Sequence, residues 1–346
     1  MSQNLSQQNL SADPPGSPDE EQKGYTGMDL RRLSKRNRLF VSFVIFILVC
    51  IVAYMVLRTQ TPYSDHAFSV QGRAVRLVLG SQGDHETLLR AAQLELERVF
   101  NRFSFFSPES ETTRLNRISE TNRKTDAETY AFLTKLEDLS EKTLWHYDFT
   151  IGIHYRPYAL FELPTLETYR YPTDLNLEDG SVHSDHPFLF FFGKAVKGYA
   201  LDCVYESIRK TDPKATGYCE IDGDIRFFGP KAGGADWIAG GWNNQELYLS
   251  SGALFHHPTL TPPEGTAAYE DHLLLSPDKG EPIKPIEYAA VIAPTALEAA
   301  CFVVAAQTLD SEILFQTLSR IGAAAYLITD GKAHYSTRWT LYTYVR

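Results

Sequence analysis

Lysine and glycine residues gather in one short segment, Gly193–Asp202, which reads GKAVKGYALD. The apolar spacing that follows predicts that this segment opens a helix. Backbone N–H groups at the start of a helix attract anions, and lysine side chains strengthen that attraction. The segment therefore suits a phosphate or pyrophosphate, although a basic loop that caps an ordinary helix has the same composition.

Carboxylates flank a glycine in a second segment, Glu220–Ile225, which reads EIDGDI. Such side chains at the end of a strand can bind a metal ion or the hydroxyl groups of a ligand, but Asp beside Gly is also usual in a plain turn. Two further segments, Ser250–Gly252 and Leu273–Pro282, are predicted to be loops at the mouth of a site. By themselves these loops do not indicate a chemistry.

The elements that must position these residues mix helix and strand without a regular order. Periodic apolar residues predict strands over 68–79 and 218–228, and helices over 85–103, 127–144, 196–210, 295–308 and 310–321. Asp330 and Gly331 predict the turn of a closing hairpin. Residues 155–190 are rich in Pro, Tyr and Asp and predict a long irregular crossing. Because no βαβ rhythm is present, the expected fold class is α+β, with mixed, largely antiparallel sheets and packed helices.

A long apolar stretch, residues 39–57, precedes this region and reads LFVSFVIFILVCIVAYMVL without a charge. At about 1.5 Å per residue its 19 residues span roughly 28 Å, close to the hydrocarbon core of a bilayer. We interpret it as one transmembrane helix, in preference to a buried core helix, a cleaved signal peptide or a lipid anchor at Cys50.

Basic residues flank this stretch unequally: Arg58 follows it, and five residues precede it, namely Arg31, Arg32, Lys35, Arg36 and Arg38. The positive-inside rule then predicts a cytoplasmic N-terminus. The expected organisation is a disordered cytoplasmic tail (1–38), a transmembrane helix (39–57), a linker (58–67) and a domain (68–346) on the periplasmic or extracytoplasmic side of the inner membrane.

Charge and cysteine content exclude some classes of protein. A net charge of −10 argues against a nucleic-acid-binding surface. Cys203, Cys219 and Cys301 lie outside the apolar stretch and lack C-x-x-C spacing. One disulfide is compatible with these residues, whereas a zinc site is not expected.

Taken in order, seven segments of the chain resemble the FAD:protein FMN transferases, the ApbE-type flavin-trafficking family. The resemblance covers about residues 70–339. The segments are FSFFSPESETTRLN at 103–116, HYDFTIG at 146–152, GKAVKGYALD at 193–202, DGDIR at 222–226, SSG at 250–252, LLLSPDKGEP at 273–282 and TALEAACFV at 295–303.

This resemblance implies an enzyme that binds FAD with Mg²⁺, transfers the FMN half to a Thr or Ser of a membrane or exported protein, and releases AMP. The residues at the family's flavin-binding positions are Phe106, His146, Tyr147, Asp148, Lys197, Gly198, Asp202, Asp224, Ser251 and Gly252. His272 lies one residue before the position of the family's loop histidine and is the predicted catalytic residue.

The predicted metal site departs from the family pattern. The resemblance places a backbone carbonyl at Ala200, but Thr295 and Ala299 stand where the family has Asp and Thr. We expect Glu298, one helical turn after Thr295, to supply the missing carboxylate. Two other functions remain open if Glu298 does not supply this carboxylate. The protein is then a module that binds FAD without transferring its FMN half, or a membrane-tethered scaffold of the same fold.

Overall fold

The computed structural model describes the chain at residues 35–59, 63–118, 121–159, 161–166, 175–242, 245–258, 274–276, 279–283 and 286–343. Two units divide the chain, residues 1–59 and 60–346. The first unit contains the helix α1 (Lys35–Thr59), in which residues 37–54 have a mean hydropathy of 2.2 and none is buried. This helix, which contains the predicted span 39–57, is long and apolar enough to cross a membrane.

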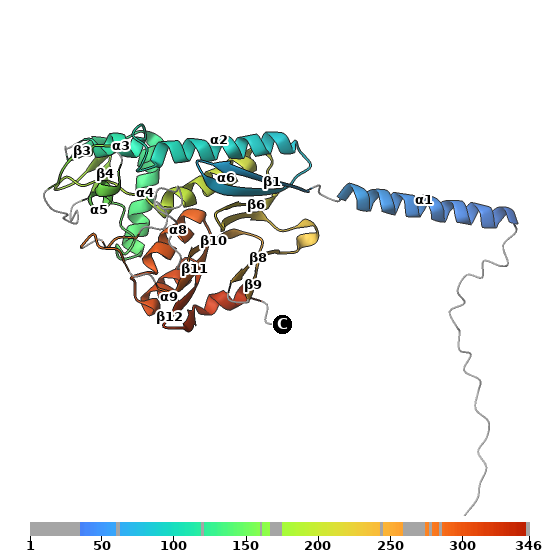
Figure 1. Cartoon of the computed structure of the whole chain (residues 1–346). Coiled ribbons are helices and arrows are strands. Elements are labelled where there is room, and N and C mark those ends of the chain that lie inside the picture. The colour runs from blue at the N-terminus through green and yellow to red at the C-terminus, as the bar shows by residue number, and fades with distance from the viewer. Residues whose placement is uncertain are drawn as a thin grey trace, which may run out of the picture. The chain divides into compact units, whose positions relative to one another are not determined.

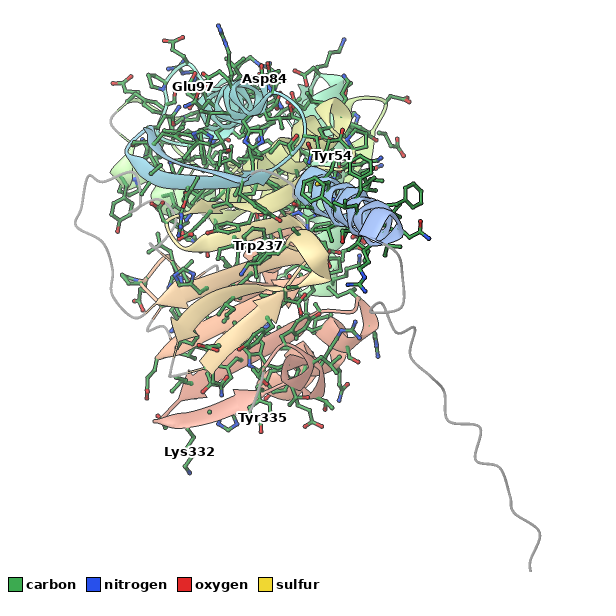
Figure 2. All side chains as sticks on the ribbon, turned by 90° about the vertical axis from the view of Figure 1, so that its right-hand side faces the viewer. Tyr54, Asp84, Glu97, Trp237, Lys332 and Tyr335 are labelled. Atoms are coloured by element: carbon green, nitrogen blue, oxygen red, sulfur yellow. The ribbon has the colours of Figure 1, made fainter. Side chains whose placement is uncertain are left out.

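The second unit is built on an eight-stranded sheet in which every neighbouring pair is antiparallel. In spatial order the strands are β1 (Tyr63–Val70), β2 (Arg73–Gly80), β6 (Thr216–Ile221), β7 (Asp224–Gly229), β10 (Gly252–Pro258), β11 (Tyr288–Ala293), β12 (Ala324–Thr329) and β13 (Lys332–Tyr335). Lys332 and Tyr335 of the edge strand β13 point outward and are exposed (Figure 2). The predicted α+β class and the hairpin at Asp330–Gly331 are both confirmed.

Two of the predicted strands are wrong because each is a hairpin. Residues 68–79 contain the turn between β1 and β2, and residues 218–228 contain the turn between β6 and β7. Both turns have positive φ at two successive residues, 50° and 81° at Gln71 and Gly72, and 50° and 89° at Asp222 and Gly223. This geometry is typical of the tight turns of hairpins. In addition, β1 includes residues 63–67, which the sequence had placed in a linker.

Three helices, α2 (His85–Phe103), α6 (Lys194–Thr211) and α8 (Ala296–Ala305), cover one face of the sheet and enclose the main apolar core (Figure 1). The helices α4 (Ala127–Lys142) and α9 (Ser311–Arg320) complete this layer. Asp84, Asp126 and Asp310 each accept a hydrogen bond at the start of a helix, which is why α2, α4 and α9 begin near their predicted positions.

A hairpin, β8 (Trp237–Trp242) and β9 (Gln245–Leu249), packs with the short helix η4 (Thr337–Leu341) on the other face of the sheet. Between α2 and α6 the chain forms smaller elements: α3 (Glu111–Asn116), β3 (Asn122–Lys124), α5 (Gly152–Tyr155), η2 (Arg156–Tyr158), β4 (Asn176–Glu178) and β5 (Ser181–His183). The turn η3 (Ala232–Gly234) precedes β8. The crossing predicted as irregular therefore contains the hairpin β4–β5, which pairs with β3.

Candidate functional site

Two buried lysines in the first turn of α6 bind one buried carboxylate of β7. Nζ of Lys194 and Nζ of Lys197 each lie 3.1 Å from Oδ2 of Asp224. The other oxygen of Asp224 accepts a hydrogen bond of 2.9 Å from the backbone N–H of His256 and lies 3.0 Å from His256 Nδ1. Burial by itself raises the pKa of Asp224, but the attraction of Lys194, Lys197 and His256 outweighs it and holds that pKa well below its usual value.

The second acidic residue of this region is Asp222, in the turn before β7. Its Oδ1 accepts a hydrogen bond from the backbone N–H of Ala74, and its Oδ2 lies 3.7 Å from Lys197 Nζ. Asp222 therefore both closes the hairpin turn and adds a weaker ion pair to Lys197. The EIDGDI segment has a structural role, with Asp224 as its buried anion.

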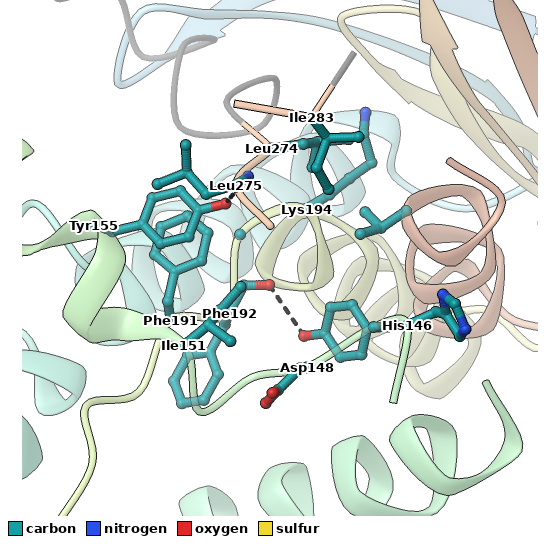
Figure 3. Close-up of a pocket in the computed structure, with 13 residues that line it drawn as sticks. His146, Asp148, Ile151, Tyr155, Phe191, Phe192, Lys194, Leu274, Leu275 and Ile283 are labelled. Carbon is teal, nitrogen blue, oxygen red and sulfur yellow. Dashed lines mark hydrogen bonds between the residues drawn. The ribbon is translucent and has the colours of Figure 1, made fainter. Parts of the chain in front are cut away.

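A small, partly open cavity of about 30 Å³ lies beside the start of α6 (Figure 3). Its walls include the predicted residues His146, Tyr147 and Asp148, together with Gly193 and Lys194 of α6. Leu274, Leu275 and Ile283 form another wall, which the Tyr155 hydroxyl fixes by accepting a 3.1 Å hydrogen bond from the Leu275 N–H. The fold therefore brings His146–Asp148 and the start of α6 to one cavity.

The polar groups on the cavity wall are already engaged with the protein. Tyr147 donates its hydroxyl to the carbonyl of Phe192 over 3.1 Å, as Figure 3 shows. Asp148 Oδ1 accepts two bonds of 2.7 Å from Thr150, one from its N–H and one from its hydroxyl. His146 Nδ1 lies 2.8 Å from the hydroxyl of Thr308, and partial burial lowers the pKa of this imidazole. These contacts give the cavity a rigid wall.

Phe106 lies in the aromatic cluster that adjoins this cavity. Its ring packs edge-on against Phe105 at 5.2 Å between centroids, and Phe105 packs in turn against Phe191. Tyr155 stacks on Phe191 with an angle of 7° between the rings. The cluster can offer aromatic surface to a flavin, but Phe106 is separated from the present cavity by Phe105 and Phe191.

Two of the three predicted metal residues, Thr295 and Glu298, lie at the start of α8, where they cap the helix. Thr295 and Glu298 form a capping box: Glu298 N–H donates to the Thr295 hydroxyl, and Glu298 Oε2 accepts from both the N–H and the hydroxyl of Thr295. Ala200 is fully buried inside α6, where the helix uses its carbonyl. Among the described residues, no group of three or more His, Cys, Asp or Glu side chains could hold a metal ion.

Asp202 also stabilises the start of α8. Its two oxygens each accept a hydrogen bond of 2.9 Å, from the N–H of Ala296 and from that of Leu297, and Arg226 Nε lies 3.0 Å from Oδ1. Burial raises the pKa of Asp202, and the Arg226 charge and the two N–H groups oppose that rise. Both carboxylates near the predicted metal site are therefore committed to the backbone of α8, and this set of ligands fits Mg²⁺ poorly.

The two predicted glycines are required by close packing. A Cβ atom on Gly198 would lie 2.6 Å from the carbonyl oxygen of Ala296, so glycine lets α6 and α8 approach. A Cβ atom on Gly252 would lie 2.7 Å from the carbonyl oxygen of Ala293, and its φ of +80° also favours glycine. Gly252 and Ser251 line a different pocket, of about 750 Å³, at the start of β10. The structure therefore separates these two residues from His146–Asp148.

Sequence reasoning missed two residues of this site, Tyr155 and His256, and one predicted residue lies outside the described part of the chain. Lys194 was noted as one of the two lysines of GKAVKGYALD, but only Lys197 was predicted to bind the cofactor, although the two residues are three apart and so on the same side of a helix. No pattern indicated His256, because its contact with Asp224 is formed only by the pairing of β7 with β10. His272 is the predicted residue that the structure does not describe.

Comparison with known proteins gives one consistent result. A family model described as the ApbE family matches residues 68–327. Three solved structures have the same fold. The ApbE protein of Thermotoga maritima has a TM-score of 0.69 and 23% identity, and the match covers 82% of this chain and 100% of that one. The flavinyl transferase ApbE of Pseudomonas stutzeri in its apo form (TM-score 0.67) and the flavin transferase ApbE of Vibrio cholerae (TM-score 0.65) are each 16% identical, and each match covers 82% of this chain and 99% of the other. No curated protein matches the chain. Since the family model spans most of the folded unit, the chain belongs to the ApbE family.

Proposed function

We propose that this protein is an FAD:protein FMN transferase. The observation that carries the proposal is the cluster of Lys194, Lys197 and Asp224 at the start of α6, beside the cavity that His146–Asp148 line. Cationic side chains at a helix start are suited to phosphate, and the aromatic cluster nearby is suited to a flat ring system. Family membership over residues 68–327 supports FAD as the ligand that combines both.

In the proposed reaction, the hydroxyl oxygen of an acceptor Thr or Ser attacks the phosphorus of the FMN half of FAD. A phosphoester bond forms to that oxygen, the bond to the bridging oxygen of the pyrophosphate breaks, and AMP leaves with that oxygen. The hydroxyl proton passes to a base. The protein contributes by holding the pyrophosphate, offsetting its charge and aligning the acceptor.

We propose His272 as the catalytic residue in this reaction because of its position in the chain. It precedes by two residues Leu274, which lines the cavity. A cavity of about 30 Å³ has room for about one water molecule and not for a flavin ring. Binding of FAD therefore requires the wall formed by Leu274, Leu275 and Ile283 to move away from Tyr155.

Binding of FAD without transfer is the second candidate function. The capping box of Thr295 and Glu298 favours it, because both predicted metal residues already stabilise α8. Such a protein would retain FAD at Lys194 and Lys197 and release no AMP.

We further propose that α1 anchors the protein in the inner membrane with its N-terminus in the cytoplasm and the folded unit outside. The helix length and the excess of basic residues before residue 39 support this orientation. An acceptor on the membrane or beyond it would then be accessible. Protease added to spheroplasts is expected to digest the chain after residue 58, and protection until lysis would contradict the orientation.

The test of the proposed function uses the full-length protein in detergent. FAD titrated into it is expected to lose fluorescence as it binds in a 1:1 ratio, because aromatic side chains would stack on the flavin. AMP release in the presence of a membrane extract, measured by chromatography, then separates transfer from simple binding. A protein that does not bind FAD would contradict both candidate functions.

A further inference from the structure

Lys194 and Lys197 lie in the first turn of α6, where a helix by itself does not favour positively charged side chains. The partial positive charge at the N-terminus of a helix repels cations and attracts anions. The first turn of α6 nevertheless contains Lys194 and Lys197, contains no acidic residue, and receives no side-chain hydrogen bond at its N-cap, Gly193. Both lysine side chains are only 1% exposed. Two buried ammonium groups need anionic partners, and in this structure Asp224 and, farther away, Asp222 are those partners.

The two lysines share one carboxylate oxygen, although Asp224 has two. Both ammonium groups lie 3.1 Å from Oδ2, and the Oδ1 atom is engaged by His256. Lys197 also has Asp222 at 3.7 Å, and it is Lys194 that lies on the cavity wall (Figure 3). Because a lysine ammonium sits on a flexible four-carbon stem, Lys194 can turn to a ligand in the cavity while Lys197 keeps Asp224 paired.

The carboxylates that a divalent cation would need are occupied at the start of α8. Asp202 accepts from two N–H groups and faces Arg226, and Glu298 accepts from the N–H and the hydroxyl of Thr295. A cation bound by these groups would compete with the hydrogen bonds that cap α8. Among the described residues, the start of α6 therefore brings the charge of Lys194 to the cavity, whereas the carboxylates at the start of α8 are already engaged in hydrogen bonds.

We propose that Lys194 supplies positive charge for the pyrophosphate of FAD while Lys197 holds Asp224, so that this protein binds FAD without a divalent cation. The inference rests on the proposed flavin function and specifies its charge chemistry. Lys194 is the residue that exchanges the Asp224 oxygen for a phosphate oxygen when FAD binds. Lys197 remains with Asp224 and Asp222 and offsets one of their two negative charges.

The test measures FAD binding to the full-length protein in detergent, by quenching of FAD fluorescence, in excess EDTA and in excess Mg²⁺. The unmodified protein is expected to have the same Kd in both solutions. Lys194→Met, which keeps the apolar stem and removes the charge, is expected to weaken binding about 10- to 150-fold in both, the range for one charge-assisted contact. Lys210→Met, at the exposed far end of the same helix, is the matched control and should bind as the unmodified protein does.

Binding that appears only with Mg²⁺, or a Lys194→Met variant that keeps its melting temperature and its affinity, would overturn the inference. The EDTA comparison needs no variant, so it decides the question even if Lys194→Met fails to fold. A protein that binds FAD only with Mg²⁺ retains the proposed flavin function while losing this inference. A protein that binds FAD under neither condition loses the flavin function itself.

Discussion

Replacing Asp224 with asparagine should strongly destabilise the folded unit at neutral pH. The side chains of Asp224, Lys194 and Lys197 are each 1% exposed, so water cannot compensate the two ammonium groups when the carboxylate charge is removed. The carboxylate that remains, Asp222, lies 3.7 Å from Lys197. Breaking a buried ion pair from one side typically costs about 3–5 kcal/mol of unfolding free energy. We expect Asp224→Asn to lose an amount in this range.

The loss should depend on pH in a defined direction. The pKa of Asp224 in the folded protein lies well below its unfolded value of 3.8, so the folded state stabilises the charged form. This contribution is fully present above the unfolded pKa and disappears as the pH falls through the lower, folded pKa. The difference in stability between the unmodified protein and Asp224→Asn should therefore be constant near neutral pH and shrink below about pH 4.

Denaturation in urea, followed by tryptophan fluorescence of the full-length protein in detergent, measures this difference at each pH. Asp222→Asn is the matched control, because asparagine tolerates the positive φ of 50° at this turn and removes only the longer ion pair. We expect the control to lose about 1 kcal/mol or less. Equal stabilities of Asp224→Asn and the unmodified protein at neutral pH would refute the role assigned to the buried cluster.

Three further predictions concern the packing around the site. Thr295→Ala removes the cap of α8 and should reduce the unfolding free energy by about 0.5–2 kcal/mol in the same urea assay, whereas unchanged stability would contradict the capping role. Gly198→Ala places a methyl group 2.6 Å from the carbonyl oxygen of Ala296, so it should lower stability by about 1–3 kcal/mol, and a neutral effect would show that α6 and α8 can separate freely. Tyr155→Phe removes the hydrogen bond to Leu275 that holds the cavity wall, so it should raise the association rate of FAD measured by stopped-flow fluorescence. A slower association rate would argue against opening of this wall.

The elements with a strong periodic signal could be predicted from the sequence. Helix α2 was expected over the residues it occupies, because Leu88, Ala92, Leu96, Val99 and Phe103 recur on one face and all of them are buried. The α+β class followed from the mixture of such segments. The predicted start of α6 at residue 196 was two residues late, which left Lys194 outside the helix whose first turn it shares with Lys197.

Local signals with two meanings were harder to interpret. Asp-Gly correctly predicted the turn at residues 330–331, but at 222–223 the same dipeptide left a turn and a ligand site both open, and the strand expected over 218–228 was not divided there. Thr295 and Glu298 have the spacing of a capping box, yet the family resemblance directed attention to a metal. In each case the residue types are compatible with both a structural role and a binding role, and only the backbone geometry of the folded chain distinguishes the two.

Contacts between strands distant in sequence could not be predicted from one sequence. The site depends on Asp224 meeting two residues of α6 and His256 of β10, across separations of about 30 residues. Ser251 and Gly252 likewise line a different pocket from His146–Asp148, which no local pattern indicated. The positions of these residues in space follow from the order of the strands in the sheet, which no local sequence pattern encodes.

The most direct test of the central claim is a transfer reaction with all of its components. Full-length protein, FAD and a detergent extract of membranes from a strain that lacks the protein are incubated together. Proteins are then separated in a denaturing gel and examined for flavin fluorescence, while AMP is measured by chromatography. We predict a fluorescent protein band and AMP in equal amounts, and neither product when any one component is omitted. Tight binding of FAD with no covalent flavin and no AMP would contradict the transferase function and establish this family member as an FAD-binding protein.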